Sequence, residues 1–247
     1  MRKILVSVIL AVACSAASLA GGLPDGLGLK VRAGYSVGGT APLEMPAAIR
    51  SFDGYRLTPS VMVGAEVSYA FTERWGFLGG LRFGNMGMDA AITVKGYRME
   101  MIKSENRIEG LFYGHVRQDV AEWVLTVPAQ ASCRLGKVLL KAGPYVSFLV
   151  SGDFSGVASD GYLRQGDPTG PKILIGTGDD SATYDFSDRM SPVQAGIGIG
   201  ADWTVTGGFG VSADLEWGLT GLFKRDFKTI EQTLYPIYGT LGLFYQF

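Results

Sequence analysis

The amino-acid sequence predicts an all-β protein, an eight-stranded antiparallel up-and-down transmembrane β-barrel. Three observations lead to this prediction. Eight segments alternate apolar and polar residues with a period of two, which is typical of a strand with two different faces. Short and long connections alternate between these segments. The polar faces carry charged residues, whereas the apolar faces carry aromatic residues near the strand ends.

The composition fits one exported β domain. The 247 residues suffice for one large domain, and with 47% hydrophobic and 18% charged residues the chain is too apolar to be disordered. The net charge is −1 and there is no basic run, so nucleic acid is excluded as a partner. The chain is apolar for an exported protein, but after the N-terminal segment it has no apolar run of about 18 residues that could form a transmembrane helix. Membrane-spanning strands explain both features, because each needs only about 9–11 residues with one apolar face.

The N-terminus has the features of a secretory signal. Arg2 and Lys3 precede a short apolar segment, 4–13, and Ser18 and Ala20 form a small-x-small cleavage site. We therefore expect residues 1–20 to be a signal peptide and residues 21–247 to be the barrel domain. Lipidation of Cys14 is an alternative way of processing the same segment. Cys133 is the one cysteine after residue 20, so we expect no internal disulfide.

The first four strands are expected in the first 134 residues. Each one places apolar residues on one face and polar or small residues on the other. They are about 27–38 (Leu29 and Val31 against Lys30 and Arg32), 60–71 (Val63 and Val67 against Gly64 and Glu66), 75–83 (Phe77 and Leu81 against Leu78 and Arg82) and 122–134 (Trp123 and Leu125 against Glu122 and Thr126).

The last four strands alternate in the same way, and the final three are the clearest. They are 138–150 (Leu140 and Ala142 against Lys141 and Gly143), 193–203 (Ile197 and Ile199 against Gly196 and Gly198), 209–219 (Ala213 and Leu215 against Asp214 and Glu216) and 235–247 (Leu241 and Leu243 against Thr240 and Gly242).

The connections predict the orientation. Tight turns are expected at 72–74, 135–137 and 204–208. Long connections are expected at about 39–59, 85–119, 151–189 and 223–234. This asymmetry is typical of barrels in the outer membrane of Gram-negative bacteria, with both termini in the periplasm and the long loops at the cell surface. Within the second long connection, 91–102 is rich in β-formers and 103–107 resembles a turn, which predicts a hairpin beyond the membrane.

Charged residues on the polar faces predict a lumen charge network. These residues are Lys30, Arg32, Glu66, Arg82, Glu122, Lys141, Asp202, Asp214 and Glu216. Buried charges must pair, so this near-balanced set predicts a plugged lumen. A polar pathway lined by the same charges is the alternative.

Aromatic residues at the ends of the apolar faces predict two membrane girdles. These residues are Tyr35, Phe71, Trp75, Phe148, Trp203, Phe209, Tyr235 and Phe247. A soluble barrel or sandwich with its apolar face inward is the alternative, because alternation alone does not define inside and outside. We expect contact with outer-membrane lipid.

Several motifs in the second half of the chain carry a family resemblance. They are Leu125–Pro128 (LTVP), Ala142–Tyr145 (AGPY), Gly196–Ala201 (GIGIGA), Trp217–Leu219 (WGL) and Gly239–Phe247 (GTLGLFYQF). On these motifs, residues 119–247 resemble the PorT-like outer-membrane β-barrel family. The resemblance implies an outer-membrane location and, for the family's namesake, a role in type IX protein secretion. The terminal Phe247 resembles the assembly signal that the barrel assembly machinery reads.

Pro128 and Pro144 fall inside two neighbouring predicted strands. Proline donates no hydrogen bond to a strand ladder. By register from the turn at Gly136, the two prolines lie nearly opposite each other. We therefore expect bulges and a local break in pairing there.

The sequence offers no strong sign of catalysis, metal or cofactor. His115 is the single histidine, and no nucleophile motif accompanies it. The segment 176–180, with Asp179 and Asp180, can ligate Ca²⁺, but it lacks the EF-hand pattern, and a solvated loop is the simpler interpretation. We expect no enzyme activity, no cofactor and no metal.

Three functions stay open on the sequence alone. The first is an accessory or structural component of an envelope assembly such as type IX secretion, with other envelope proteins as partners. The second is a surface-binding protein or adhesin that acts through its loops. The third is a transporter of small or hydrophobic molecules. The binding interpretation rests on aromatic residues expected in exposed loops, which are Phe52, Tyr55, Tyr97, Tyr162 and Tyr184.

Overall fold

Eight antiparallel strands form a closed ring in the computed structural model, which describes residues 26–42, 47–58, 60–103, 105–227, 229 and 233–247. The predicted signal peptide and Cys14 lie outside the described residues. Each ring strand pairs with two neighbours, and pairing of the last strand with the first closes the ring. The ring strands are β1 (Leu27–Pro42), β3 (Ser60–Ala70), β4 (Trp75–Lys103), β5 (Asn106–Leu135), β6 (Val138–Gln165), β9 (Val193–Thr206), β10 (Phe209–Gly218) and β11 (Leu234–Gln246). The predicted all-β fold and the eight strands are confirmed.

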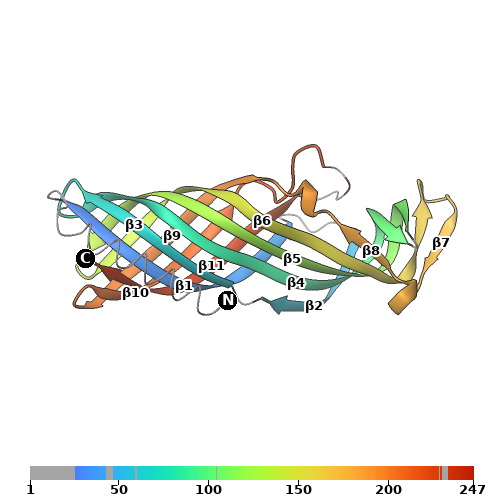
Figure 1. Ribbon diagram of the computed structural model, residues 1–247, viewed down its shortest axis with the longest axis horizontal. Helices are drawn as coiled ribbons and strands as arrows, with labels where there is room; N and C mark the ends of the chain where they lie inside the picture. The colour runs from blue at the N-terminus through green and yellow to red at the C-terminus, as the bar shows by residue number, and fades with distance from the viewer. Residues whose placement is uncertain (1–25, 43–46, 59, 104, 228, 230–232) are drawn as a thin grey trace.

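Three tight turns lie at one end of the ring, at the left in Figure 1, and join β3 to β4, β5 to β6 and β9 to β10. Gly136 adopts φ +61° and Gly208 adopts φ +82° in two of these turns. Because side chains with a Cβ rarely adopt this left-handed conformation, glycine allows the chain to reverse within two residues. The three turns were predicted from the sequence.

The hairpin predicted within 85–119 is confirmed, because β4 ends at Lys103 and β5 begins at Asn106. The continuation of β6 beyond residue 150 was not predicted. Strands β4, β5 and β6 have 29, 30 and 28 residues. They run past the ring and build a second part of the molecule, at the right in Figure 1. We call this part the extension and define it as residues 88–103, 106–121 and 152–165 of these strands, together with three short strands. The short strands are β2 (Ile49–Leu57) on β4, β7 (Lys172–Ile175) on β6, and β8 (Ala182–Asp185) between β6 and β4.

A β-bulge explains why the sequence pattern ended β6 at Val150. Val124 pairs with Leu149 and Trp123 pairs with Ser151, so Val150 is an extra residue in β6. A bulge of one residue moves every later side chain to the other face. The alternation therefore breaks at the bulge although the strand continues to Gln165, and the predicted loop 151–189 is largely β-structure.

The extension has a hydrophobic core of its own. Its members come from β4, β5, β6, β7, β8, the start of β11, the segment 186–190 and residue 222. The two 3₁₀ turns η1 (Gly178–Asp180) and η2 (Ser187–Arg189) flank β8. The most deeply buried members are Met99, Met101, Phe112, Phe154, Ala158, Leu163, Ala182 and Leu222. This core holds the extension as a packed unit rather than as separate loops.

The two prolines interrupt the pairing of β5 with β6. Pro128 pairs with Tyr145, and the ladder resumes only at the pair of Ala131 and Ala142. The predicted break is therefore confirmed. The predicted bulge at this place is wrong, because the register is the same on both sides of the gap.

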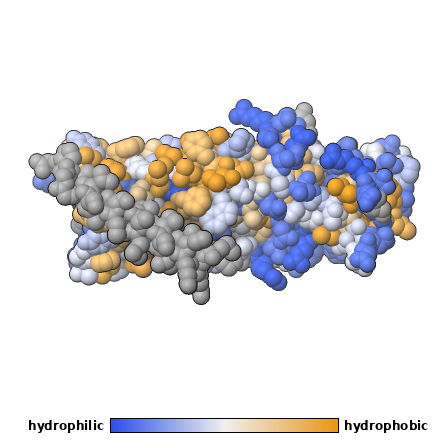
Figure 2. Space-filling model, viewed as in Figure 1, coloured by the Kyte–Doolittle hydropathy of each residue, from blue (hydrophilic) through white to orange (hydrophobic). Residues whose placement is uncertain are grey.

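The outer wall of the ring is apolar. Figure 2 shows hydrophobic residues gathered over the ring and hydrophilic residues over the extension on the visible face. The predicted girdle residues Trp75, Trp203 and Phe209 are more than half exposed, as expected for side chains that contact lipid. No helix within the described residues is long and apolar enough to cross a membrane.

Candidate functional site: a charged lumen, a packed extension and a pocket in the wall

All nine predicted lumen residues point into the ring and are buried. Eight of them form one continuous series of ion pairs, in which acids and bases alternate. The series runs Lys30, Asp202, Lys141, Asp214, Arg32, Glu66, Arg82, Glu216. We call it the lumen network. Its four bases and four acids balance, so the lumen network itself carries no net charge.

The central contacts of the lumen network are short, and their side chains are almost completely buried. Arg32 reaches Glu66 and Asp214, each with 2.6 Å between nitrogen and oxygen. Arg82 reaches Glu66 and Glu216, each at 2.7 Å. The planar guanidinium suits such paired contacts with carboxylates, because its donors point in fixed directions. Each arginine therefore links two acids from different strands across the lumen.

Glycine makes room for the network. A Cβ at Gly200 would lie 2.5 Å from the Asp214 carboxylate and 2.7 Å from Cε of Lys141. Any larger residue on this inward position would displace one of these charged groups. The small inward residues of β9 thus leave the space that the charged side chains of the lumen network occupy.

Glu122 does not join the lumen network in the described part of the chain. Its carboxylate instead accepts a hydrogen bond of 2.6 Å from Nε2 of Gln194. The sequence placed Glu122 on the correct face but gave no way to see that Gln194 would lie beside it. Because Glu122 lies outside the lumen network, the network contains four acids and four bases.

Aromatic side chains also fill the lumen. Nζ of Lys30 lies 4.6 Å from the ring centre of Phe244, which points inward from β11. Tyr145 and Tyr238 are likewise buried inside the ring. Together with the lumen network, these side chains occupy the interior that a water-filled channel would need.

Two of the five aromatic residues expected in exposed loops are buried. Tyr97 and Tyr184 belong to the core of the extension, with 6% and 4% exposure, so their predicted exposure is wrong. Gly96, with φ +69°, is an extra residue opposite β5 and turns Tyr97 inward. A single-residue bulge of this kind leaves no clear trace in the sequence pattern.

The outer face of the extension carries an aromatic and cationic cluster. The rings of Tyr113 and Tyr162 stack with centres 4.8 Å apart. Nζ of Lys172 lies 4.1 Å from the ring centre of Tyr162, and the guanidinium of Arg164 lies 5.9 Å from it. We call these four residues the tyrosine–cation cluster. Stacked aromatic rings beside cations are a common feature of binding surfaces.

His115 lies on the outer face of the extension among polar side chains. Its Nδ1 is 2.9 Å from the hydroxyl of Thr93, which also contacts Asp53. Asp160 lies on the other side, 3.9 Å from Nε2. Because the two acids flank opposite nitrogens, they do not converge on one point. Among the described residues, no cluster of histidine, cysteine or acidic side chains can hold a metal ion.

An acidic side chain supports the end of β8. Asp185 accepts hydrogen bonds from the amide and the hydroxyl of Ser187, at 2.9 and 2.6 Å, and the Ser187 hydroxyl oxygen accepts one from the Phe154 amide. The bonds from Ser187 hold the pKa of Asp185 below its usual value of 3.8. Its contribution to stability is therefore present above that value and is lost as the pH falls through the lowered pKa.

We expect the Ser187 and Phe154 amides to exchange faster in acid once Asp185 takes up its proton. Hydrogen exchange, corrected for intrinsic rates and compared between about pH 6 and a series of steps below pH 3.8, measures this change. In D185N the two amides should already exchange faster at about pH 6 and respond little to acid. An unaltered acid response in D185N would contradict the assignment.

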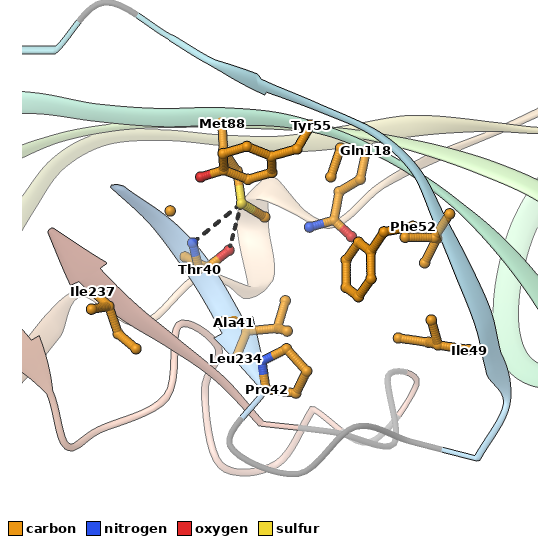
Figure 3. A pocket seen from close by; sticks show the side chains of 13 residues that line it. Thr40, Ala41, Pro42, Ile49, Phe52, Tyr55, Met88, Gln118, Leu234 and Ile237 are labelled. Atoms are coloured by element: carbon orange, nitrogen blue, oxygen red, sulfur yellow. Dashed lines mark hydrogen bonds between the residues drawn. The ribbon is translucent and has the colours of Figure 1, made fainter. Parts of the chain in front are cut away.

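An apolar pocket of about 280 Å³ lies where the ring meets the extension (Figure 3). Residues of β1, β2, β4, β5 and β11 line it. Sδ of Met88 accepts a hydrogen bond from the Thr40 amide at 3.2 Å, and the Tyr55 hydroxyl donates to the Gly38 carbonyl at 2.8 Å. These contacts connect β1 with β4 and with β2. Nothing in the sequence pattern pointed to this pocket, because its lining comes from five separate strands.

A closed ring with a charged interior and an apolar, aromatic outer wall defines a β-barrel of the outer-membrane class. The chain matches the family model described as "Outer membrane protein beta-barrel domain" over residues 18–224. It therefore belongs to this family and is an outer-membrane β-barrel protein. The match supports the predicted outer-membrane β-barrel but not the PorT-like name that the sequence motifs suggested.

Solved structures similar to this chain are also outer-membrane proteins. Ail, the attachment invasion locus protein of Yersinia pestis, shares 16% identity at a TM-score of 0.40, with 91% of this chain and 100% of that one covered. The outer membrane protein OprG from Pseudomonas aeruginosa shares 10% at 0.33, covering 89% and 95%. The outer membrane protease OmpT from Escherichia coli shares 12% at 0.34, covering 91% and 97%. No curated protein matches the chain. These low similarities assign no activity.

Proposed function

We propose that this protein is a non-conducting, non-enzymatic outer-membrane barrel that holds a stiff binding platform at the cell surface. In this proposal both termini are periplasmic and the extension is extracellular. The orientation is supported by the position of the tight turns, because bacterial outer-membrane barrels place their short turns in the periplasm.

The observation that carries the proposal is the extension itself. Strands β4, β5 and β6 continue without interruption from the ring into a packed unit that has its own core. A ligand bound to this unit meets a preorganised surface and avoids the entropy cost of ordering a loop. The tyrosine–cation cluster supplies half-buried aromatic rings and an exposed lysine, which are groups that such a surface needs.

The first expected result concerns conduction. Purified barrel in a planar lipid bilayer should give no stepwise single-channel currents, because the lumen network and the inward aromatics fill the interior. A porin in the same bilayer is the positive control. Regular, ion-selective current steps from the wild-type protein would contradict the proposal and favour the polar-pathway alternative.

The second expected result concerns partners. A photo-crosslinking residue in place of Tyr162 should give discrete cross-linked products on intact cells, whereas the same residue in place of Lys137, in the β5–β6 turn, should give none. The substitution Y162A removes the tyrosine side chain and should weaken capture of that partner by about tenfold, since an interface tyrosine commonly contributes more than 1 kcal/mol. Products from position 137 alone, or from neither position, would contradict the proposal.

A second candidate is an accessory role in an envelope assembly such as type IX protein secretion, which the PorT-like motifs suggest. An apolar recess on the outer wall supports this candidate. It crosses β6, β9, β10 and β11, and small residues form its floor, including Gly200, Ala201, Ala213 and Gly239. Cross-links from this recess to another envelope protein, rather than from Tyr162, would favour the second candidate over the first.

A further inference from the structure

We infer that the pocket between β1 and β2 binds a single uncharged hydrocarbon chain that enters from the membrane. This site differs from the tyrosine–cation cluster, and it makes the wall of the ring, rather than its sealed interior, a place where a ligand binds. Figure 3 shows the pocket with its lining side chains.

The pocket exists because the wall has a seam. Strand β1 pairs with β3 only as far as Ser36, which lies opposite Ser60. Beyond that point β1 continues to Pro42 with β11 as its partner, while β4 pairs with β2 from Met88 onward. Within the described residues β1 and β2 share no ladder, so the hydrogen-bonded wall is open between them.

Side chains from both faces of the wall line the seam. Ala41 and Ile237 belong to the outward faces of β1 and β11, whereas Met88, Ala90 and Ile92 point inward from β4. The pocket therefore reaches from the outer surface into the wall. A ligand can enter from the side without passing through the lumen network.

The seam lies at the depth of the predicted aromatic girdle that is nearer the extension. Ala41 pairs with Tyr235, one of the predicted girdle residues. Below it on the same outward face of β1 are Val37 and Tyr35, which are 40% and 45% exposed and lie on the apolar outer wall. The mouth of the pocket thus borders the hydrocarbon region of the bilayer, and a lipid chain is the neighbouring molecule with the right chemistry.

The lining selects an uncharged chain. Among the described residues that line the pocket there is no lysine, arginine, aspartate or glutamate, so these residues offer no partner to an ionised group. A cavity of about 280 Å³ lies near the lower end of the range for small-molecule pockets, which suits one short chain rather than a fused ring system.

Polar groups among the described lining residues are few. They are the Thr40 hydroxyl, the Tyr55 hydroxyl and the Gln118 amide. Within the described part of the chain, the Thr40 hydroxyl donates to a weak sulfur acceptor, Sδ of Met88 at 3.5 Å, so it remains able to bond a ligand. A hydroxyl or carbonyl at the end of the chain fits these groups. An apolar cavity without such a ligand would be expected to remain dry.

The test uses the full barrel in phospholipid nanodiscs and photoreactive hydrocarbon probes. One arm adds a medium-chain alcohol that carries a diazirine, and the other uses a phospholipid with a diazirine in its acyl chain. After illumination, peptide mass spectrometry compares labelling of the pocket residues with labelling of the outer wall around Leu241 and Leu243. The wall serves as an internal measure of simple partitioning into the membrane.

A90F places a phenyl ring in the pocket, and A91F is the matched control, because Ala91 is the next residue of β4 and points to the opposite face. We expect pocket labelling to saturate in at least one arm, and to fall by about tenfold in A90F but not in A91F. Displacing two buried methylenes suffices for such a change. Wall labelling should rise linearly with probe concentration and stay equal in all variants.

Two outcomes would overturn the inference. One is pocket labelling that rises linearly with both probes, as wall labelling does. The other is saturable labelling that A90F leaves unchanged. If A90F fails to fold, as judged by its electrophoretic shift on heating, G39A replaces it. A Cβ at Gly39 would lie 2.3 Å from the Tyr55 hydroxyl and 2.9 Å from Sδ of Met88, so it displaces two side chains that line the cavity.

Discussion

Replacing Arg32 by methionine is expected to destabilise the barrel by about 3–5 kcal/mol, the cost of breaking a buried ion pair from one side. Arg32 is fully buried and holds both Glu66 and Asp214. Its removal leaves two desolvated carboxylates, and only Arg82 and Lys141 remain to offset them. Equilibrium unfolding in urea from lipid vesicles, followed by tryptophan fluorescence, measures the change.

Arg117 provides the matched control for this prediction. It pairs with Asp89 at 2.7 Å, but its side chain is 56% exposed and lies on the extension. R117M should therefore change the free energy of unfolding by less than about 1 kcal/mol. Equal effects of R32M and R117M would show that the lumen network does not contribute to stability in the way proposed. An R32M barrel that conducts ions would additionally identify Arg32 as part of the seal.

Replacing Phe154 by alanine is expected to cost about 3–5 kcal/mol, as for other large-to-small changes in a packed core. Phe154 is fully buried in the extension and contacts the rings of Tyr184, Phe186 and Phe223. Because the extension has its own core, the loss should unfold the extension and leave the ring intact. Limited proteolysis should then cut F154A within 151–189, while the remaining barrel keeps its electrophoretic shift on heating.

Val157 lies three residues further along β6 on the opposite, outward face and is 36% exposed. V157A removes apolar atoms from the same strand without making a cavity, so its proteolysis should match that of the wild-type protein. If F154A is also resistant, the extension does not depend on its core. If F154A loses the whole barrel, the ring and the extension unfold as one unit.

Much of the ring could be predicted because its strands alternate strictly. In β9 and β10 the inward residues are small or polar and the outward ones are apolar, and the predicted bounds of β9, β10 and β11 differ from the structure by only a few residues. Period-two alternation is a local property of the chain, so it can be read without knowing any contact. For the same reason the nine lumen residues could be placed on one face.

The extension could not be predicted to the same degree. Its strands change their inward face at Val150 and at Gly96, where single-residue bulges reverse the alternation. Tyr97 was therefore expected outside and lies in the core. A bulge is defined by the strand that it pairs with, because it is the residue that has no partner there. The register of the two strands therefore cannot be read from the sequence of one strand alone.

The sequence by itself determined that this protein is a barrel of eight strands with charges on one face and aromatic residues on the other. Only the tertiary structure decided how those charges pair, that Glu122 bonds Gln194 instead, and that a seam between β1 and β2 holds a pocket. The physical reason is that a face is set by neighbours two residues apart. Ion pairs and pockets are instead set by the register between strands that lie far apart in the chain.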